Sequence, residues 1–291
     1  MSSDIRITDL SLDQSGRQPD RDGLGAVAWV CLGFVLMLAA VAVIAQFIAP
    51  YDPYLQVIVD SNQGPSPAHL LGTDELGRDI WSQLIYGTRT ALVGPFIVAI
   101  GAGLIGTSVG LLTGVRGGLV DGITMRITEI VYAVPPLILA IVLVGLFDGG
   151  YWLAVLVLIL LSAPADVRVV RSAVLAQREL PYVVAARAVG LRGVRIATRH
   201  VLPNVTPTVS ANVLLQFVGA LVALSGLAFL GLGVAPGSPD WGLMVAENRS
   251  NLDINPLAVI MPALLITLLA ISVTILGDRV YDLLSGRRSV G

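Results

Sequence analysis

Six long stretches without a charged residue constrain the fold of this chain more than any other feature. They cover 23–51, 90–115, 130–147, 149–165, 200–239 and 254–277. About 20 consecutive apolar residues suffice for a helix to cross the hydrocarbon core of a bilayer. Only 13% of the 291 residues are charged and 55% are hydrophobic, too few charges to cover a soluble surface. We predict an all-α integral membrane protein with six transmembrane helices.

The lengths of three stretches refine this prediction. The third and fourth are short, so we expect their helices to extend into the charged flanks, from about Leu119 and to about Val174. The fifth is long enough for two crossings, but its end, 231–239, is rich in glycine and proline. Because that composition is typical of turns, we predict one helix followed by an exit loop.

The placement of arginines tests the number of crossings and fixes the orientation. With six crossings and the N-terminus inside, fifteen of the 18 basic residues fall on the inner side and three outside. The outer three are Arg78, Arg89 and Arg249. Membrane proteins carry such an excess of basic residues on the cytoplasmic side. We therefore predict that the N- and C-termini are both cytoplasmic.

These boundaries organise the chain around one membrane core with polar ends. The first residues are polar and carry no apolar run of their own, which is typical of disorder. The predicted parts are a disordered cytoplasmic tail over 1–23, a first transmembrane helix over 24–49, an extracytoplasmic loop over 50–89, a five-helix core over 90–284 with a cytoplasmic loop over 178–203, and a cytoplasmic tail over 285–291.

All 18 basic residues are arginine, and the chain contains no lysine. A Walker A loop needs a lysine on the β- and γ-phosphates, and a Schiff-base enzyme needs a lysine amine. Neither chemistry is available to this chain. If ATP drives its activity, a different chain must bind the nucleotide.

The inner segment between the fourth and fifth crossings has the pattern of a short projecting helix. Pro181 is suited to the first helical position, and Gly190 to an end that requires a positive φ. We predict a helix from about Pro181 to Val189, with Pro203 starting the next crossing. Its closely spaced alanines form a low surface that another protein could approach: Ala185, Ala186 and Ala188. A helix resting on anionic lipid through its arginines is an equally good interpretation of these residues alone.

This segment resembles the cytoplasmic coupling loop of ABC importer permeases, in which Glu-Ala-Ala is followed after three residues by glycine and after nine more by Ile-x-Leu-Pro. Ala185-Ala186, Gly190 and Leu202-Pro203 fall at the matching spacing, while Val184 and His200 depart from the glutamate and the isoleucine. The resemblance implies that the segment couples to an ATPase. The residues that would carry this role are Pro181, Ala185, Ala186, Arg187, Gly190, Leu202 and Pro203.

Further stretches narrow the resemblance to the C-type permease subunit of oligopeptide, dipeptide and nickel importers. Most of them lie on the outer side, and Leu224 stands where members of this family usually carry a glutamate. The matching stretches are 69–79 with 86–89, 226–233 with 239–242, and 277–282.

A subunit of this kind implies a type I ABC importer permease fold in a bacterial inner membrane. The expected partners are a homologous second permease, two ABC ATPases or one fused ATPase chain, an extracytoplasmic substrate-binding protein and the lipid bilayer. ATP and Mg²⁺ would be bound by the ATPases. We expect no cofactor, metal or nucleic acid on this chain. Oligopeptides or dipeptides are the expected cargo, with nickel or another small solute as the alternative.

Two motifs inside the second crossing have competing interpretations. Gly101 to Gly106 fits the dinucleotide-binding fingerprint, and Gly106 to Gly110 fits a nucleophile elbow with Ser108 as nucleophile. Both need a preceding strand, so we favour close helix packing through Gly103, Gly106 and Gly110. A membrane serine hydrolase and a gradient-driven secondary transporter remain the alternatives from other functional classes.

Two features of the third crossing complete the candidates. Arg126 and Glu129 are spaced for an i,i+3 ion pair near the inner end of the helix, which we expect to position it at the membrane interface. Pro135-Pro136 interrupts the backbone hydrogen bonding and should kink the helix. The kink would form part of the wall of a translocation path or serve packing alone.

Overall fold

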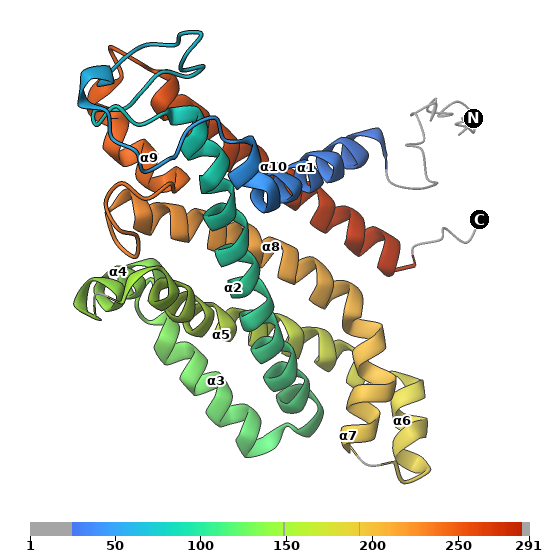
Figure 1. Ribbon diagram of the computed structural model, residues 1–291. Coiled ribbons are helices and arrows are strands. Elements are labelled where there is room, and N and C mark those ends of the chain that lie inside the picture. Colours follow the sequence, from blue (N-terminus) through green and yellow to red (C-terminus); the bar gives the residue numbers. More distant parts are fainter. Residues whose placement is uncertain (1–24, 148, 192, 287–291) are drawn as a thin grey trace, which may run out of the picture.

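The computed structural model describes residues 25–147, 149–191 and 193–286, and these residues are helical apart from their connections (Figure 1). The tail predicted over 1–23 and residues 287–291 of the tail predicted over 285–291 lie outside the described residues. The long helices are α1 (Ala26–Ile48), α2 (Ile80–Arg116), α5 (Gly150–Arg178), α8 (Leu202–Phe229) and α10 (Leu257–Leu284). The shorter ones are η1 (Ile58–Asp60), α3 (Gly118–Tyr132), α4 (Pro136–Phe147), α6 (Pro181–Ala188), α7 (Gly193–Ile196), η2 (Ala197–Val201), α9 (Trp241–Asn248) and η3 (Arg249–Asn251).

The helices account for six crossings in the described part of the chain. Five are long and apolar enough to span a membrane, and α3 with α4 forms the sixth when the pair is counted as one span. That pair is bent by 74° at its break, where Pro135 lies just outside α4 and Pro136 begins it. The predicted kink is therefore confirmed. Gly25 lies beside the Arg279 side chain, so the chain enters and leaves the bundle on the same side.

The extracytoplasmic loop is shorter than the prediction over 50–89. Helix α2 begins at Ile80, because the Asp79 carboxylate accepts hydrogen bonds from the Ser82 backbone N–H at 2.8 Å and from its hydroxyl at 2.7 Å. Charge alone marked the edge of the helix at Arg89, but residues 80–88 before it carry no charge and are mostly buried. Residues 80–89 therefore belong to the helical core.

The fifth crossing also begins earlier than predicted. Pro203 lies in the first turn of α8, but helical backbone runs without a break from Gly193 through α7 and η2 into it. The π-helical turn η2 ends at Val201, two residues before Pro203, and Val201 has helical backbone angles. The other end agrees with the prediction: α8 stops at Phe229, and Gly231 adopts φ 74° in the exit loop.

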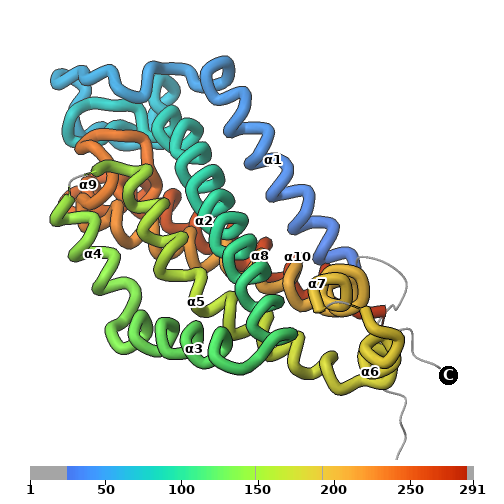
Figure 2. Tube along the Cα trace, turned by 90° about the horizontal axis from the view of Figure 1, so that it is seen from below, coloured from blue at the N-terminus to red at the C-terminus, as the bar shows by residue number. Residues whose placement is uncertain are grey.

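Helix α2 runs through the centre of the bundle, with α1 on one side and α5 on the other (Figure 2). A Cβ added at Gly106 would collide with Asp166 of α5, and one at Gly110 would meet Val170 at 2.9 Å. A Cβ at Gly103 would lie 2.7 Å from Val213 of α8. The expectation that these glycines permit close helix packing is confirmed. Because they lie inside one continuous helix, neither a dinucleotide loop nor a strand-to-helix elbow at Ser108 exists.

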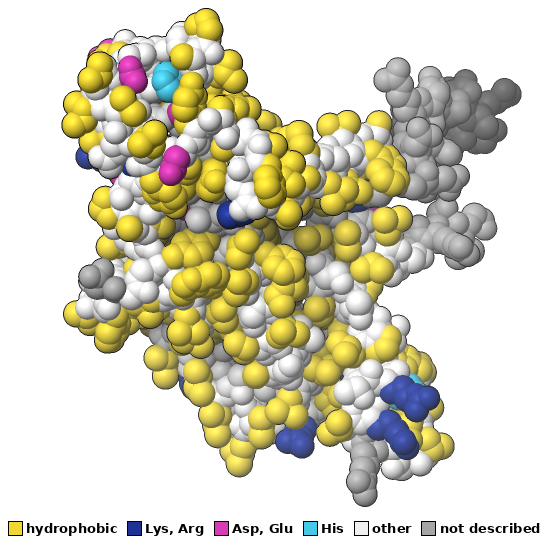
Figure 3. Space-filling model, in the orientation of Figure 1, with side chains coloured by type: hydrophobic (Ala, Val, Ile, Leu, Met, Phe, Trp, Pro, Cys, Tyr) yellow, Lys and Arg dark blue, Asp and Glu magenta, His cyan; other side chains and the backbone are white. Residues whose placement is uncertain are grey.

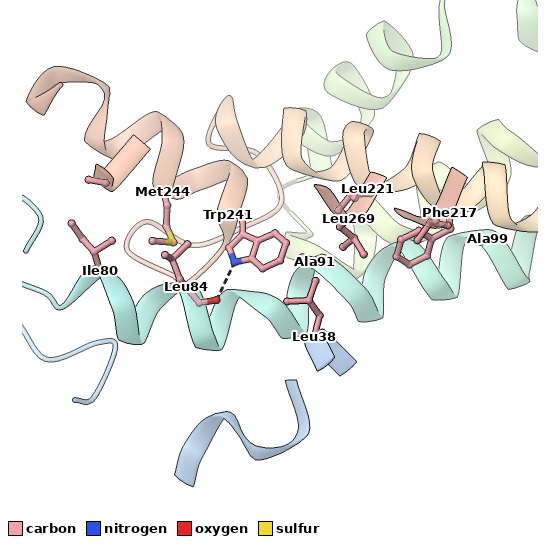
Figure 4. Close-up of a cluster of buried hydrophobic side chains, with 12 residues drawn as sticks. Leu38, Ile80, Leu84, Ala91, Ala99, Phe217, Leu221, Trp241, Met244 and Leu269 are labelled. Atoms are coloured by element: carbon pink, nitrogen blue, oxygen red, sulfur yellow. Dashed lines mark hydrogen bonds between the residues drawn. The ribbon is translucent and has the colours of Figure 1, made fainter. Parts of the chain in front are cut away.

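The outer end of the bundle is closed by α9, which the sequence did not predict. Trp241 is 1% exposed, and its indole N–H donates to the Leu84 carbonyl at 3.0 Å (Figure 4). Gly87 leaves room for the indole, since a Cβ there would lie 2.7 Å from it. This anchor fixes α9 against the first turns of α2.

Candidate ATPase-docking site

Helix α6 is held on the bundle by one apolar face. Val183 is 1% exposed and Ala186 is 7% exposed, and both pack in a cluster with Val174 of α5 and Val205 of α8. Leu111 of α2 belongs to the same cluster. The short helix is therefore packed against α5, and it belongs to an apolar cluster that also includes residues at the inner ends of α2 and α8.

The opposite face of α6 is free in the chain. Val184, Ala185, Ala188 and Val189 are exposed, and so is Arg187. Figure 3 shows arginine side chains gathered at this end of the molecule, over the region of α6 and α7. An exposed apolar strip edged by arginines has the composition of a protein-binding surface.

Ala186 does not lie on this free face, contrary to the expectation that it would contribute to the low alanine surface. Three residues after Val183, it is on the same side of the helix and points into the bundle. Spacing along the sequence identified the helix but could not say which side faces the chain itself. Pro181 and Ala185 are exposed, as a docking role requires.

The end of α6 is fixed by backbone geometry. Gly190 adopts φ 78°, and its N–H donates to the Arg187 carbonyl at 2.9 Å. The Leu191 N–H donates to the Ala186 carbonyl at 3.2 Å, which completes a Schellman motif. The predicted role of Gly190 as the helix end is confirmed. Leu202 is half-buried against the same inner cluster, and Pro203 is exposed.

Helix α3 takes part in two ion pairs. The predicted pair is present, with the Arg126 guanidinium donating to the Glu129 carboxylate at 2.9 Å, and both side chains are exposed. The pair that joins two helices was not predicted: Arg171 of α5 donates through two nitrogens to the Asp121 carboxylate. Arg171 and Asp121 are 50 residues apart in the chain, and no local spacing rule connects them.

A buried cation holds the outer loop to α9. Arg78 is 2% exposed and donates to Asp74 at 2.6 Å and to Glu247 of α9 at 2.8 Å. The other Glu247 oxygen accepts from the Gly237 N–H at 2.8 Å. The charged motif of the outer loop thus forms a rigid cap together with the exit loop after α8, on the side opposite α6.

Asp240, which follows the exit loop and precedes α9, allows the packing of this outer region to be tested by the pH dependence of stability. Its carboxylate caps α9 by accepting from the Gly242 and Leu243 N–H groups, and burial raises its pKa, an effect that hydrogen bonds partly offset. The folded chain therefore holds this proton more tightly than the unfolded chain, and the associated stability is lost as pH rises above about 4. We expect Asp240→Asn, which keeps the cap, to lose less stability than the parent over that rise. If the melting temperatures of the parent and of Asp240→Asn changed by the same amount between pH 4 and 8, this expectation would be wrong.

These features define a class of protein: a helical membrane protein whose described residues form six spans when α3 and α4 are counted as one, with a short helix exposed at its arginine-rich end. The sequence model of one protein family, the binding-protein-dependent transport system inner membrane component, matches residues 106–290. The model of the N-terminal TM domain of oligopeptide transport permease C matches residues 26–65. The chain belongs to the family of inner membrane components of binding-protein-dependent transport systems, as a permease of the oligopeptide type.

Curated relatives match over most of their length. The glutathione transport system permease protein GsiD of Pectobacterium atrosepticum is 39% identical over 253 residues, 86% of this chain and 84% of the relative. The dipeptide transport system permease protein DppC of Haemophilus influenzae is 34% identical over 263 residues, 88% and 89% of the two chains. An inward-facing structure of the MetNI methionine ABC transporter shares the fold, with a TM-score of 0.58 at 21% identity, covering 69% of this chain and 96% of that one.

Proposed function

We propose that this chain forms half of the translocation pathway of an ATP-driven importer for short peptides. The observation that carries the proposal is the free face of α6, which projects from the arginine-rich end while its other face belongs to the apolar cluster shared with α2, α5 and α8. A homologous second permease would supply the other half of the pathway. An extracytoplasmic binding protein would deliver the solute to the capped outer end.

The free face of α6 is the proposed contact with an ATPase. With no lysine in the chain, ATP and Mg²⁺ belong to the ATPases, which would be two chains or one fused chain. Closure of the ATPases around ATP would displace α6 and, through the inner apolar cluster, move the spans between inward- and outward-open states. This is alternating access by rigid elements.

Short peptides are the proposed cargo because the two relatives described above are named for them, one for glutathione and one for dipeptides. The test is uptake of labelled dipeptide, glutathione and ⁶³Ni²⁺ by cells with and without this chain. We expect peptide uptake to be lost and nickel uptake to be unchanged without it. Loss of nickel uptake alone would contradict the peptide assignment.

A substitution at the end of α6 tests whether its shape matters for docking. A Cβ at Gly190 meets nothing within 4 Å, so we expect Gly190→Val to act through the positive φ, at about 1–2 kcal/mol. We expect several-fold less ATPase to co-purify with Gly190→Val. Gly190→Asn, which tolerates this conformation, is the matched control and should retain near-normal amounts. Equal co-purification of the parent, Val and Asn forms would count against the proposal.

A further inference from the structure

A buried carboxylate in α5 has no place in the docking site or the outer cap. Asp166 is 2% exposed, and one of its oxygens accepts a hydrogen bond from the Asn212 amide of α8 at 2.7 Å. The other oxygen is buried and has no hydrogen-bond partner in the described part of the chain. Burying such a group is costly, and polar groups inside membrane bundles are retained mainly where they serve function.

Helix α2 lies very close to α5 at the position of Asp166. Gly106 of α2 presses on Asp166, and a Cβ at that position would collide with both the backbone and the side chain of the aspartate. Apolar contacts alone permit helices to slide, because their energy changes little with a small shift in register. A hydrogen bond has strict distance and angle requirements and therefore fixes the register. Within 25–147, 149–191 and 193–286, this is the one side-chain hydrogen bond between α5 and α8.

The pair lies on the two helices that lead into and out of the docking segment. Helix α5 ends at Arg178, just before α6, and α8 follows directly on α7 and η2. The inner apolar cluster begins one turn along α5 from Asp166, at Val170, and two turns back along α8 from Asn212, at Val205. The pair therefore stands between the seat of α6 and the membrane-spanning halves of both helices.

We propose that Asp166 and Asn212 are positioning residues for coupling, which fix α5 to α8 so that a displacement of α6 reaches the spans as one movement. The inference rests on the proposed function of α6. Without the bond, part of the displacement is absorbed by sliding between the two helices, and ATP is hydrolysed without a matching conformational change. Solute transported per ATP then falls, although the chain folds and the ATPases still bind.

The test uses the complete importer in lipid nanodiscs and proteoliposomes. Asp166→Val with Asn212→Val removes both polar groups together, a change that is near neutral for stability because no unpaired group remains. We expect assembly and the melting temperature to be preserved and solute transported per ATP to fall about fivefold. Asp166→Asn is the matched control, because its amide can still hydrogen-bond to Asn212. We expect it to transport about as much solute per ATP as the parent.

The outcomes separate the inference from the function on which it rests. A parent-like ratio of transport to ATP hydrolysis in an assembled Val–Val complex would overturn the inference alone. Absence of ATP-driven uptake by the parent complex would contradict the proposed function itself. If the Val–Val chain assembles poorly, the swap Asp166→Asn with Asn212→Asp decides. If the swapped complex transports as much solute per ATP as the parent, the hydrogen bond is the feature that matters. If an assembled swapped complex transports much less solute per ATP, the inference is overturned.

Discussion

Ala185→Arg is expected to abolish ATP-driven uptake while the chain remains folded and inserted. Ala185 lies on the free face of α6, so the arginine meets no other part of the chain. It would stand in the docking contact, where a long charged side chain keeps the helix from close approach. The loss of a central interface contact costs about 2 kcal/mol or more, which corresponds to at least a 30-fold weaker complex. Uptake and ATPase co-purification measure the effect.

Ala186→Arg makes the sharpest comparison, because the neighbouring residue faces the opposite way. Ala186 is packed in the inner cluster, so arginine there should unseat α6 and reduce the amount of folded chain in the membrane. Leu283→Arg adds the same charge at an exposed position at the inner end of α10 and is the control for charge alone. Normal uptake by Ala185→Arg, or equal loss of folded chain in both alanine variants, would contradict the assignment of the two faces.

Gly106→Leu is expected to destabilise the fold by about 3 kcal/mol, the upper end for overpacking. Even a Cβ at this position would collide with the backbone of α5, which cannot rotate away as a flexible side chain would. We expect little folded protein in the membrane and a lower melting temperature in detergent for what remains. Gly106→Ala should show a smaller effect in the same direction.

The matched control for this substitution is Gly219→Leu. Gly219 lies inside α8, but nothing is within 4 Å of a Cβ added there. The two variants therefore insert the same side chain into long helices, at one position with a close neighbour and at one without. Equal stability of the Gly106 and Gly219 variants would show that α2 and α5 do not pack at the distance described.

Features that depend on one helix at a time were predictable from the sequence. Charge-free stretches located the spans, Pro135-Pro136 the bend, and Pro181 and Gly190 the two ends of α6. Helix starts were less well placed where a single charged residue lies inside the helix, as Arg89 does in α2. Asp79 caps α2 ten residues before the charge-based boundary at Arg89.

Features that depend on two helices meeting were not predictable. Asp166 and Asn212 are 46 residues apart, and Arg78 and Glu247 are 169 apart, so no sequence period relates them. The side of α6 that faces the bundle was missed for the same reason. Alanines occur on both faces, and only the positions of α5 and α8 distinguish the buried Ala186 from the exposed Ala185.

The most direct test of the account is peptide uptake into proteoliposomes that contain this chain, a second permease, the ATPases and the binding protein. We predict accumulation of a labelled dipeptide that requires ATP and all four components, and that disappears when this chain is omitted. Uptake by this chain alone under an ion gradient, or undiminished ATP-driven uptake in its absence, would contradict the conclusion that it is half of an ATP-driven conduit.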